Sequence, residues 1–595
     1  MSLWRELAFE QVASPGDGGS DKRMPLAEAV RRFVRPGMKL DAVSLQARPV
    51  AALHELIRQF AGRDPGFELI SSSLSGNYLQ LVGAGLLRRA IVSFAGEGYP
   101  TPGPSPVVAR ALGQGSLELE SWSMLTISQR LLAGALGVPF FATRSLAGSD
   151  LGKELTASGG YAEVEDPFHP GRVQGVVSAY RPDLAFVHAW AADPAGHAIC
   201  FPPHQENVYG ALAAREGVVL TVHRVVDRAT VRRCAHLVRI PADRVVAVCE
   251  VPYGSHPYGN YAVDLPGLRP YANDYPFMKS HREAQESAER YARWLDEWVL
   301  GVPDWPTYLE KLGAERLEAL ELLARPESWK DELLHHAAAL DAAPPVGPVE
   351  ETIVQAARAI GERVRALGVR SVLSGVGQAA LAAWLASHQL RAEGIDITLL
   401  AETGMVGHDP RPADPFLVNF RNLPTSTQLS DVLETLGLHA CGVGNGCLAA
   451  LGAAQVDRHG NVNSSWGADG RFLVGSGGAN DVGSAARELL LVAAQHRRSF
   501  VPEVDFVTTP GERVHTVVSS MGRYERRDGE LVLTAVFEHR GESVEERVRT
   551  IRERCGWELR VAEPVEQLPA ASEEEVTRLR LFDPERFFLG KAGPG

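Results

Sequence analysis

The stretch Ile397–Pro410, which reads ITLLAETGMVGHDP, decides how the chain is interpreted. Apolar and β-branched residues run to Ala401, so we expect a buried strand there. A single acid, Glu402, follows this strand, and Thr403-Gly404 then turns the chain. A carboxylate at the end of a buried strand is desolvated and held still, which suits a nucleophile or a general base. A solvated loop acid is the alternative interpretation.

Strands and helices alternate on both sides of this stretch. The expected strands are Phe67–Ser71, Ala90–Phe94, Leu184–His188, Val218–Val222, Ser371–Ser374, Ile397–Ala401, Phe506–Thr508 and Leu531–Val536. The expected helices include Val50–Phe60, Ile127–Leu136, Glu350–Leu367 and Ala379–Ala392. This alternation predicts βαβ units and mostly parallel, buried sheets, that is, an α/β fold.

A segment rich in proline and small residues, His335–Val349, interrupts the alternation. It reads HHAAALDAAPPVGPV and shows no apolar periodicity, which is typical of a linker. We therefore predict a first domain at 1–335, a linker at 336–349 and a second domain at 350–595. A length of 595 residues also exceeds what one hydrophobic core supports.

The two predicted domains share a short motif. Asp193-Pro-Ala-Gly196 in the first and Asp457-Arg-His-Gly460 in the second both follow an apolar run. In such an Asp-x-x-Gly turn, the aspartate caps the turn and the glycine takes a positive φ. Together with the matching alternation, this predicts two related α/β domains joined in tandem.

Composition excludes several classes of function. The 73 acidic and 60 basic residues are spread along the chain and give a net charge of −13, so nucleic acid is not an expected partner. Cys441 and Cys447 are spaced C-x5-C, which lacks the gap of about two to four residues of a structural zinc site. Six cysteines in so long a chain fit a reducing cytoplasm. The charged start MSLWRELAFEQ does not resemble a signal peptide, and no run of about 18 apolar residues predicts a membrane span.

Two glycine-rich segments are candidate binding loops. Gly375-Val376-Gly377-Gln-Ala-Ala follows a strand and opens a helix, so it matches the dinucleotide fingerprint G-x-G-x-x-A. The acid that this fingerprint needs at the end of the second strand is missing, because Asp396 lies at the strand's start. Backbone N–H groups at such a turn also suit an anion or an oxyanion. The second segment contains Gly475, Gly477, Gly478, Ala479 and Asn480, and it is either a ligand loop or a tight structural turn.

A second carboxylate rivals Glu402. Glu97 lies between Gly96 and Gly98 after an expected strand, so its placement along the chain is much like that of Glu402. The sequence contains neither a G-x-S-x-G nor an H-E-x-x-H motif, so it gives no support for a serine hydrolase or a zinc peptidase.

These segments together resemble glutaconate CoA-transferase, a family I CoA-transferase. The C-terminal part resembles its B subunit through SGVG at 374–377, AETG at 401–404, GAAQVDRHGNVNSS at 452–465, RFLVGSGGAND at 471–481 and VDFVTTPG at 504–511. The N-terminal part resembles its A subunit through PFFATRSLAGSDL at 139–151, VHAWAADPAGHA at 187–198, PYGSHP at 252–257 and YLEKLGAERL at 308–317. The resemblance covers nearly the whole chain in order. It implies A and B subunits fused in one chain, with open α/β domains of the CoA-transferase (NagB/RpiA-like) type.

The resemblance also implies a mechanism and a set of site residues. Glu402 occupies the position that attacks an acyl-CoA thioester in the family. An acyl–glutamyl anhydride and then a glutamyl-CoA thioester would form, and a free carboxylic acid would accept the CoA. The residues expected to bind the oxyanion or CoA are Gly375, Val376, Gly377, Gly404, Gly475, Gly477, Gly478, Ala479 and Asn480. CoA would be a substrate, with no permanently bound cofactor and no metal, and the chain would form a homo-oligomer.

The sequence departs from the family in two places, and each keeps an alternative open. Leu40–Gln46 reads LDAVSLQ where the family's A-type chains carry Gly-Gly-Phe, which indicates an acyl group other than a short dicarboxylate. Glu97 lies in a segment that varies within the superfamily, some members of which cleave rings of steroid-type acyl-CoAs by hydrolysis. In such an enzyme Glu97 would activate water. A non-catalytic CoA-binding module is the second alternative.

Overall fold

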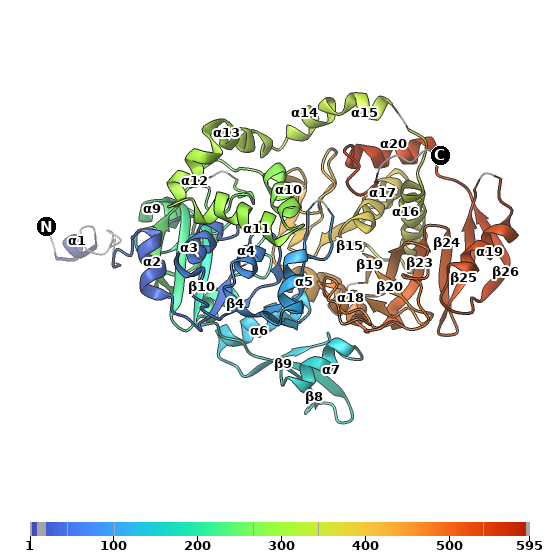
Figure 1. Ribbon diagram of the computed structural model, residues 1–595, viewed down its shortest axis with the longest axis horizontal. Helices are drawn as coiled ribbons and strands as arrows, with labels where there is room; N and C mark the ends of the chain where they lie inside the picture. Colours follow the sequence, from blue (N-terminus) through green and yellow to red (C-terminus); the bar gives the residue numbers. More distant parts are fainter. Residues whose placement is uncertain are drawn as a thin grey trace.

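The computed structural model describes residues 3–8, 19–43, 46–99, 101–263, 265, 267–342, 344–444, 446–539 and 541–590. It shows two α/β halves side by side, each built around its own sheet (Figure 1). The N-terminal half, coloured blue to green, lies on the left of the view, and the C-terminal half, yellow to red, on the right. Among the described residues, none of the helices combines the length and apolar character that a membrane crossing requires.

The first sheet is mostly parallel, as expected. Its parallel strands run in the order β14, β12, β10, β1, β2, β4 and β6. Their bounds are β1 (Lys39–Ala42), β2 (Phe67–Ile70), β4 (Leu87–Val92), β6 (Glu118–Ser121), β10 (Leu184–Ala192), β12 (Gly217–Val225) and β14 (Val245–Glu250), and the short strands β11 (Ala198–Ile199) and β13 (Val238–Ile240) pair antiparallel at one side. Every residue of β10 is buried, because its apolar run lies at the centre of a sheet covered on both faces.

Most helices of the N-terminal half pack around this sheet, but α1 (Leu3–Glu6) stands away from it at the left of the view (Figure 1). The helices of this half are α1, α2 (Leu26–Phe33), α3 (Val50–Phe60), α4 (Tyr78–Gly83), α5 (Pro106–Gly113), α6 (Met124–Leu136), α7 (Asp150–Ala157), α8 (Tyr209–Ala213), α9 (Arg228–Arg233), α10 (Tyr275–Ala284), α11 (Ala288–Leu295), α12 (Trp305–Leu312) and α13 (Ala314–Leu323). Aromatic side chains of α10–α12 pack into the same core as β2 and α3. A small sheet of β7 (Phe140–Thr143), β9 (Val173–Ser178) and β8 (Tyr161–Glu165) projects with α7 from the bottom of the view.

The second sheet repeats the core of the first. Its strand order is β18, β17, β16, β15, β19, β22, β23, β24, β25 and β26. Their bounds are β15 (Ser371–Ser374), β16 (Thr398–Ala401), β17 (Met405–Val406), β18 (Gln428–Leu429), β19 (Cys447–Gly452), β22 (Glu488–Ala493), β23 (Val514–Ser519), β24 (Gly522–Arg527), β25 (Glu530–Phe537) and β26 (Val561–Leu568). The helices of this half are α16 (Pro348–Leu367), α17 (Gln378–Ala392), α18 (Ala479–Ala485), α19 (Val544–Glu553) and α20 (Glu573–Phe582), and α16, α17 and α20 pack together (Figure 1).

The parallel cores of the two halves correspond strand for strand. The series β2, β1, β10, β12, β14 matches the series β16, β15, β19, β22, β23 in order and direction. Both Asp-x-x-Gly turns form, with Gly196 at φ +105° and Gly460 at φ +77°. A Cβ on either glycine would press against the valine that opens the last strand of its series, Val245 or Val514. The repeated motif therefore allows the same close contact between glycine and valine in each half. The predicted α/β fold class is confirmed.

Two sequence-based expectations differ from the structure. Phe506–Thr508 is not a strand: Val507 instead exchanges backbone and side-chain hydrogen bonds with Asp150 of the first half. The predicted linker at 336–349 contains a helix, α15 (Ala337–Asp341), which follows α14 (Ser328–His335), because its alanines favour helix. The domain limits 1–335 and 350–595 stay a prediction.

Candidate active site

A cavity of about 520 Å³ lies between the two halves. The first half contributes Arg48, Glu97 and Tyr258 to its lining, and the second half contributes Val376 and Glu402. The two carboxylates that the sequence analysis singled out therefore face one space, although they lie far apart in the chain.

Glu402 directly follows strand β16, which lies between β15 and β17 in the second sheet. The Gly404 N–H donates to the Ala401 carbonyl over 3.1 Å, and β17 then pairs antiparallel with β16. This tight turn needs Gly404 at φ +115°, a conformation that other residues rarely adopt. Because the backbone on both sides is hydrogen-bonded, the half-buried Glu402 side chain is held where it lines the cavity.

The Glu402 carboxyl is poorly solvated. Burial, followed by the nearby charge of Asp481, raises the pKa of Glu402 to about 7, and a hydrogen bond from the Gly478 N–H opposes this rise. A Cβ on Gly478 would lie 2.3 Å from Oε2 of Glu402, so glycine leaves the carboxylate the space it occupies. At neutral pH, part of the protein population therefore carries Glu402 as the neutral acid, and the rest carries it as a weakly hydrated, reactive carboxylate.

Asp481 joins the glycine-rich loop of the second half to the first half. Its side chain is 0% exposed and accepts hydrogen bonds from the Leu125 N–H at 3.0 Å and from Ser145 Oγ at 2.6 Å. Burial raises the pKa of Asp481 to about 6. Asp481 thus fixes the position of the loop that carries Gly478, and its charge acts on Glu402.

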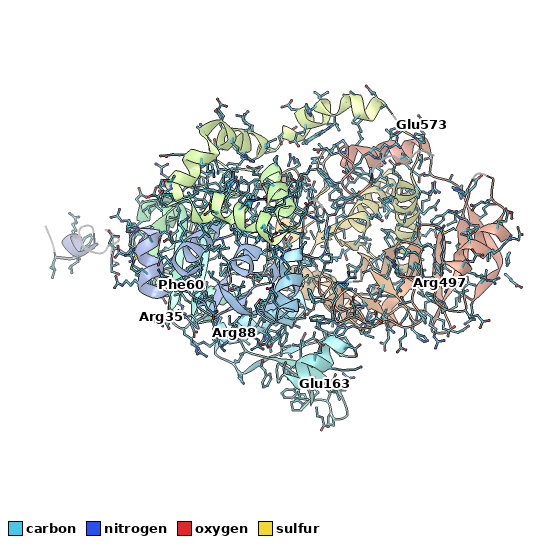
Figure 2. The ribbon with its side chains drawn as sticks, in the orientation of Figure 1. Arg35, Phe60, Arg88, Glu163, Arg497 and Glu573 are labelled. Carbon is cyan, nitrogen blue, oxygen red and sulfur yellow. The ribbon has the colours of Figure 1, made fainter. Side chains whose placement is uncertain are left out.

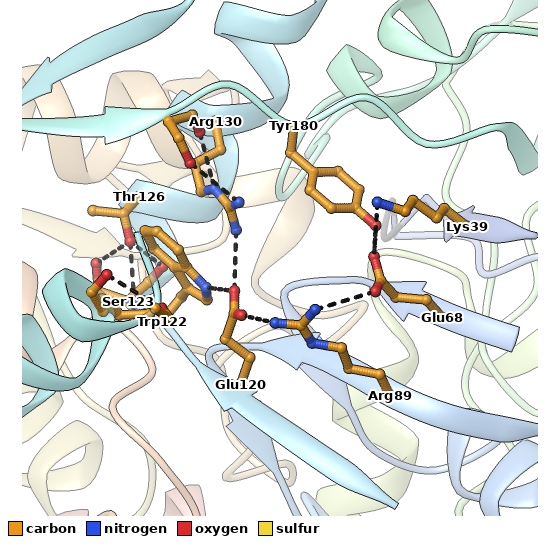
Figure 3. A network of polar contacts seen from close by, with 12 residues as sticks. Lys39, Glu68, Arg89, Glu120, Trp122, Ser123, Thr126, Arg130 and Tyr180 are labelled. Atoms are coloured by element: carbon orange, nitrogen blue, oxygen red, sulfur yellow. Dashed lines mark hydrogen bonds and ion pairs between the residues drawn. The ribbon is translucent and has the colours of Figure 1, made fainter. Parts of the chain in front are cut away.

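The start of helix α6, which meets this loop, is fixed from the other side by a polar network (Figure 3). The Met124 N–H donates to the Gly477 carbonyl over 2.9 Å. Two residues earlier, Trp122 Nε1 donates to Glu120 over 2.6 Å, and Glu120 also forms ion pairs with Arg89 and Arg130. The network continues across the first sheet to Glu68 and Lys39. It ties the edge of the candidate site to the rigid sheet.

Glu97 is held more tightly than Glu402. Its side chain is 4% exposed and accepts a hydrogen bond from Gln285 Nε2, while Gln285 Oε1 accepts from Ser105 Oγ at 2.7 Å. Burial raises the pKa of Glu97 to about 7, against the effects of Gln285 and Arg282. The preceding strand β5 (Phe94–Ala95) touches the other half, since the Ala95 N–H donates to the Val474 carbonyl over 2.9 Å.

Most of the N-terminal half matches a known protein family. A family model described as coenzyme A transferase matches residues 23–248. Over 299 residues the chain is 32% identical to the A subunit of 3-oxoadipate CoA-transferase from Pseudomonas knackmussii, a match that covers 49% of this chain and 98% of that protein. The chain belongs to the coenzyme A transferase family.

Further relatives of this CoA-transferase match parts of it. The A subunit of glutaconate CoA-transferase from Acidaminococcus fermentans is 28% identical over 51% of this chain and 95% of its own length. The B subunit of the P. knackmussii 3-oxoadipate enzyme is 27% identical over 32% of this chain and 78% of its own length. An acyl-CoA transferase from Escherichia coli O157:H7 shares the fold over 97% of this chain and 98% of its own, with a TM-score of 0.63 at 16% identity. The resemblance to CoA-transferase A and B subunits is confirmed, and the chain is an enzyme that uses CoA as a substrate.

The structure separates the predicted binding residues of this CoA-transferase into two groups. Those that line the cavity with Glu402 are Gly375, Val376, Gly475, Gly477, Gly478 and Ala479. Gly404 forms the turn described above, and Gly377, at φ +80°, starts α17. Asn480 accepts from the Leu146 N–H at 2.8 Å and donates to the Thr508 carbonyl at 2.9 Å, so it also bridges the halves.

Several residues around the cavity had no role in the sequence analysis. They are Arg48, Asp481, Gln285 and the aromatic residues Tyr99, Tyr275 and Phe416. Asp481 closes the RFLVGSGGAND motif, and that position was the one available signal for it. The others owe their place to contacts between distant segments. In the departing stretch Leu40–Gln46, Ser44 and Leu45 lie outside the described residues.

Proposed function

We propose that this CoA-transferase moves CoA from an acyl-CoA to a free carboxylic acid by a ping-pong mechanism through Glu402. The observation that carries the proposal is the carboxyl of Glu402, which lies at a strand end in the cavity between the halves, against the backbone of Gly478. A carboxylate with few water neighbours is a strong nucleophile, and a pKa of about 7 leaves part of it ionised at neutral pH.

In the first half-reaction, a carboxylate oxygen of Glu402 attacks the thioester carbon and expels the CoA thiolate, which gives an acyl–glutamyl anhydride. The thiolate then attacks the glutamyl carbonyl carbon and releases the first carboxylic acid, which leaves a glutamyl-CoA thioester. The acceptor carboxylate attacks that thioester and the steps run in reverse. Every bond that forms replaces one that breaks, so the cycle is balanced without a redox cofactor.

Backbone N–H groups near Glu402 are suited to stabilise the oxyanions of these steps. The Gly375 N–H is already bound to the Ala450 carbonyl at 2.8 Å, so it is not available. The Val376 N–H has no acceptor within the described part of the chain, and Val376 lines the cavity. We assign the oxyanion role to Val376, with the Gly478 N–H at the Glu402 carboxyl, where one donor commonly contributes about 3–4 kcal/mol.

The small residues Gly475, Gly477, Gly478 and Ala479 would form the wall along which CoA approaches Glu402. Their lack of side chains lets the thioester arm lie against the backbone. Gly377, Gly404 and Asn480 would act indirectly, by fixing the loops on which these residues lie.

Trapping the covalent intermediate tests the proposal. The full-length protein is incubated with a panel of acyl-CoAs without acceptor, treated with borohydride or hydroxylamine, digested and analysed by mass spectrometry. A modified peptide containing Glu402 is expected, and the E402Q variant, treated in the same way, should give none. Release of free CoA with an unmodified Glu402 would contradict the transferase mechanism.

A second candidate function is hydrolysis or ring cleavage of a cyclic, steroid-type acyl-CoA with Glu97 as the base. Glu97 favours it because a second carboxyl with a pKa of about 7 lines the same cavity and is oriented by Gln285. Product analysis separates the two functions: the hydrolase consumes water and needs no acceptor acid, whereas the transferase yields a new acyl-CoA.

We also propose that the chain is a fusion of A-like and B-like domains that acts in the cytoplasm as a homo-oligomer. The projecting small sheet supports self-association, since Phe140, Phe168 and Val173 on it and its loops are exposed. Light scattering coupled to size-exclusion chromatography measures this directly. A mass of one chain at micromolar concentration would exclude the oligomer.

A further inference from the structure

A loop of the first half reaches across to the second half, beside the turn at Gly404. The His204 N–H donates to the Ser430 carbonyl, and the Val432 N–H donates to the Gln205 carbonyl, each over 2.7 Å. The Ser430 N–H donates in turn to the Gly404 carbonyl, also over 2.7 Å. Hydrogen bonds on both sides thus fix Gln205 against the second half, one segment away from the turn that follows the candidate nucleophile.

The residues that follow Gln205 hold this loop from within. Glu206 is 1% exposed, and its Oε2 accepts a hydrogen bond from the Ser72 N–H over 2.5 Å. Asn207 is 0% exposed, and its side-chain amide donates to Asp431 of the second half. Of these three loop residues, Gln205 alone lines the cavity between the halves. The loop is therefore clamped on both sides of the one side chain that it presents to the cavity.

The backbone at Gln205 has an unfavourable conformation. Its φ is +45°, a left-handed value that strains an L residue with a long side chain. Asparagine tolerates such values, as Asn207 does at φ +67°, and glycine adopts them freely. Neither of these residue types stands at position 205. A function of the glutamine side chain in the cavity accounts for the strain that the loop retains.

The first half also borders the charge that develops during the transfer. When a Glu402 oxygen bonds to the acyl carbon, an electron pair of the thioester carbonyl moves onto the acyl oxygen. The pair returns as the C–S bond breaks and CoA leaves as the thiolate. The donors at Val376 and Gly478 both belong to the second half. A preorganised donor on the opposite wall would add to the stabilisation of this oxyanion.

We infer that the side-chain amide of Gln205 donates a hydrogen bond to the acyl oxygen while the acyl carbon is tetrahedral. The inference rests on the proposed function, because it takes Glu402 as the nucleophile. Gln205 transfers no proton and stays a neutral amide throughout. The same acyl oxygen becomes one of the two carboxylate oxygens of the released acid. Gln205 therefore also orients the carboxylate of the acceptor before it attacks.

A neutral amide suits this place better than a cation. A lysine or arginine beside the turn would pair with the Glu402 carboxylate and lower the pKa of Glu402 from its value of about 7. An amide stabilises the oxyanion without that effect on the nucleophile. Because the clamped backbone sets the position of the donor before the substrate binds, little reorganisation is needed when the charge develops.

Gln205→Gly separates the side chain from its strained backbone. It removes the amide and relieves φ +45°, so the midpoint of thermal unfolding should rise by about 1 °C or more. The maximal rate at which acyl-CoA modifies Glu402 should nevertheless fall roughly 100-fold. The acyl-CoA concentration at half this rate should change less than about threefold, because the hydrogen bond strengthens in the transition state. Rapid-quench mass spectrometry with acetyl-, butyryl-, adipyl- and benzoyl-CoA measures both quantities.

Two further variants make the test specific. Asp64→Gly is the matched control, since Asp64 has φ +44° but does not line the cavity. Asp64 follows α3, whose last residue, Phe60, lies at the left of the view, away from the second half (Figure 2). This variant should raise the midpoint of thermal unfolding in the same way and leave the rate unchanged. Gln205→Asn keeps an amide that tolerates the backbone and should recover part of the lost rate.

The possible outcomes separate the inference from the proposed function. If Gln205→Gly keeps its rate within about threefold of the wild type, the inference is wrong, although the modified Glu402 still supports the transferase. A variant that loses stability and affinity together would also overturn the inference, since Gln205 would then merely hold the loop.

A wild type that releases CoA with Glu402 unmodified contradicts the proposed function. The acyl oxygen gains the same charge when water attacks, so Gln205→Gly should then slow the release of CoA roughly 100-fold. An equal rate of release in the variant and the wild type would refute the inference. A protein that turns over none of the acyl-CoAs would refute the inference and the proposed function together.

Discussion

Glu402 and Glu97, one from each half, share three properties although they do not follow corresponding strands. Each follows a short strand, lines the same cavity and has a pKa that burial raises to about 7. Their fixation differs. The Glu97 carboxyl is held by the side-chain amide of Gln285, which Ser105 orients in turn, whereas the groups that act on the Glu402 carboxyl are the Gly478 backbone and the charge of Asp481.

This difference shows that a shifted pKa alone does not assign a role. A clamped carboxyl with one oxygen bound to an amide is suited to hold or move a proton at a fixed point. A carboxyl that faces the cavity against a glycine is free to approach a carbonyl carbon. Variants at these two carboxyls and at their neighbours separate the two roles.

The largest effect is expected from Glu402→Gln. The amide keeps the shape of the side chain but removes the nucleophile, so CoA transfer should fall on the order of 10⁴-fold or more. The measurement is the rate of CoA transfer between an acyl-CoA and an acid, with folding checked by circular dichroism. A variant that retains a tenth of the activity would remove Glu402 from the mechanism.

Gly478→Ala should reduce transfer by roughly 100-fold, since a displacement of about 1 Å at a reacting group has that effect. The new Cβ would collide with the Glu402 carboxyl, whereas the backbone at Gly478, with φ −87°, accepts alanine without strain. Gly452→Ala is the matched control, because Gly452 also lines the cavity but its Cβ would meet nothing within 4 Å. Equal losses in the two variants would argue against a specific contact with Glu402.

Glu97→Gln should lower CoA transfer less than about tenfold, since a proton-holding group away from the covalent step contributes modestly. The same variant distinguishes the hydrolase: if water attack at Glu97 is the real reaction, product release without acceptor should disappear in Glu97→Gln and persist in Glu402→Gln. The rate of CoA transfer and the rate of product release without acceptor are therefore measured in both variants. The transferase predicts that Glu402→Gln loses transfer, and the hydrolase predicts that Glu97→Gln loses acceptor-independent release.

The smallest effect concerns pH. Because the pKa of Glu402 lies near 7 rather than 4.5, its reactive carboxylate form increases as pH rises through 7, and transfer should increase with it. Asp481→Asn removes the neighbouring negative charge, so the midpoint should move to lower pH and the rate at pH 6 should rise roughly two- to fivefold relative to its plateau. An unmoved midpoint in the pH–rate profile would mean that Asp481 acts through its hydrogen bonds alone.

The same shifts fix how stability depends on pH. Glu402 and Glu97 hold their protons in the folded protein between about pH 4.5 and 7, where the unfolded chain has already lost them. The folded state therefore binds more protons over this range, and the free energy of unfolding should fall as pH rises through it. Both glutamine variants should show a weaker fall in chemical unfolding experiments at pH 5 and pH 7.5.

Local sequence predicted much of the fold and part of the site. The apolar run before Glu402 and the glycine after it determine a strand and a turn through near neighbours, so β16 and its acid were predictable. The Asp-x-x-Gly turns were recognisable for the same reason. The prediction of a strand at Phe506–Thr508 was wrong. Its side chains favour a strand, but the backbone of Val507 is hydrogen-bonded to Asp150 of the other half, and the local sequence carries no sign of that contact.

The remainder of the site depends on contacts between distant segments. Asp481 and Leu125 are 356 residues apart in the chain, and Arg48 meets Tyr258 across 210 residues. No local pattern distinguishes these side chains from ordinary surface residues, since their environment exists once both sheets have formed and packed. A shared cavity for Glu97 and Glu402 was beyond prediction for the same reason.

The position of the cavity between the halves has a consequence for how the enzyme behaves on dilution. In any enzyme whose site lies between two separate polypeptides, the two must associate first, so the active fraction depends on protein concentration. Here one polypeptide supplies both walls, with the helices α14 and α15 running from one half to the other (Figure 1). The second wall is present at an effective concentration set by this connection, so specific activity should stay constant down to the lowest amounts that can be assayed.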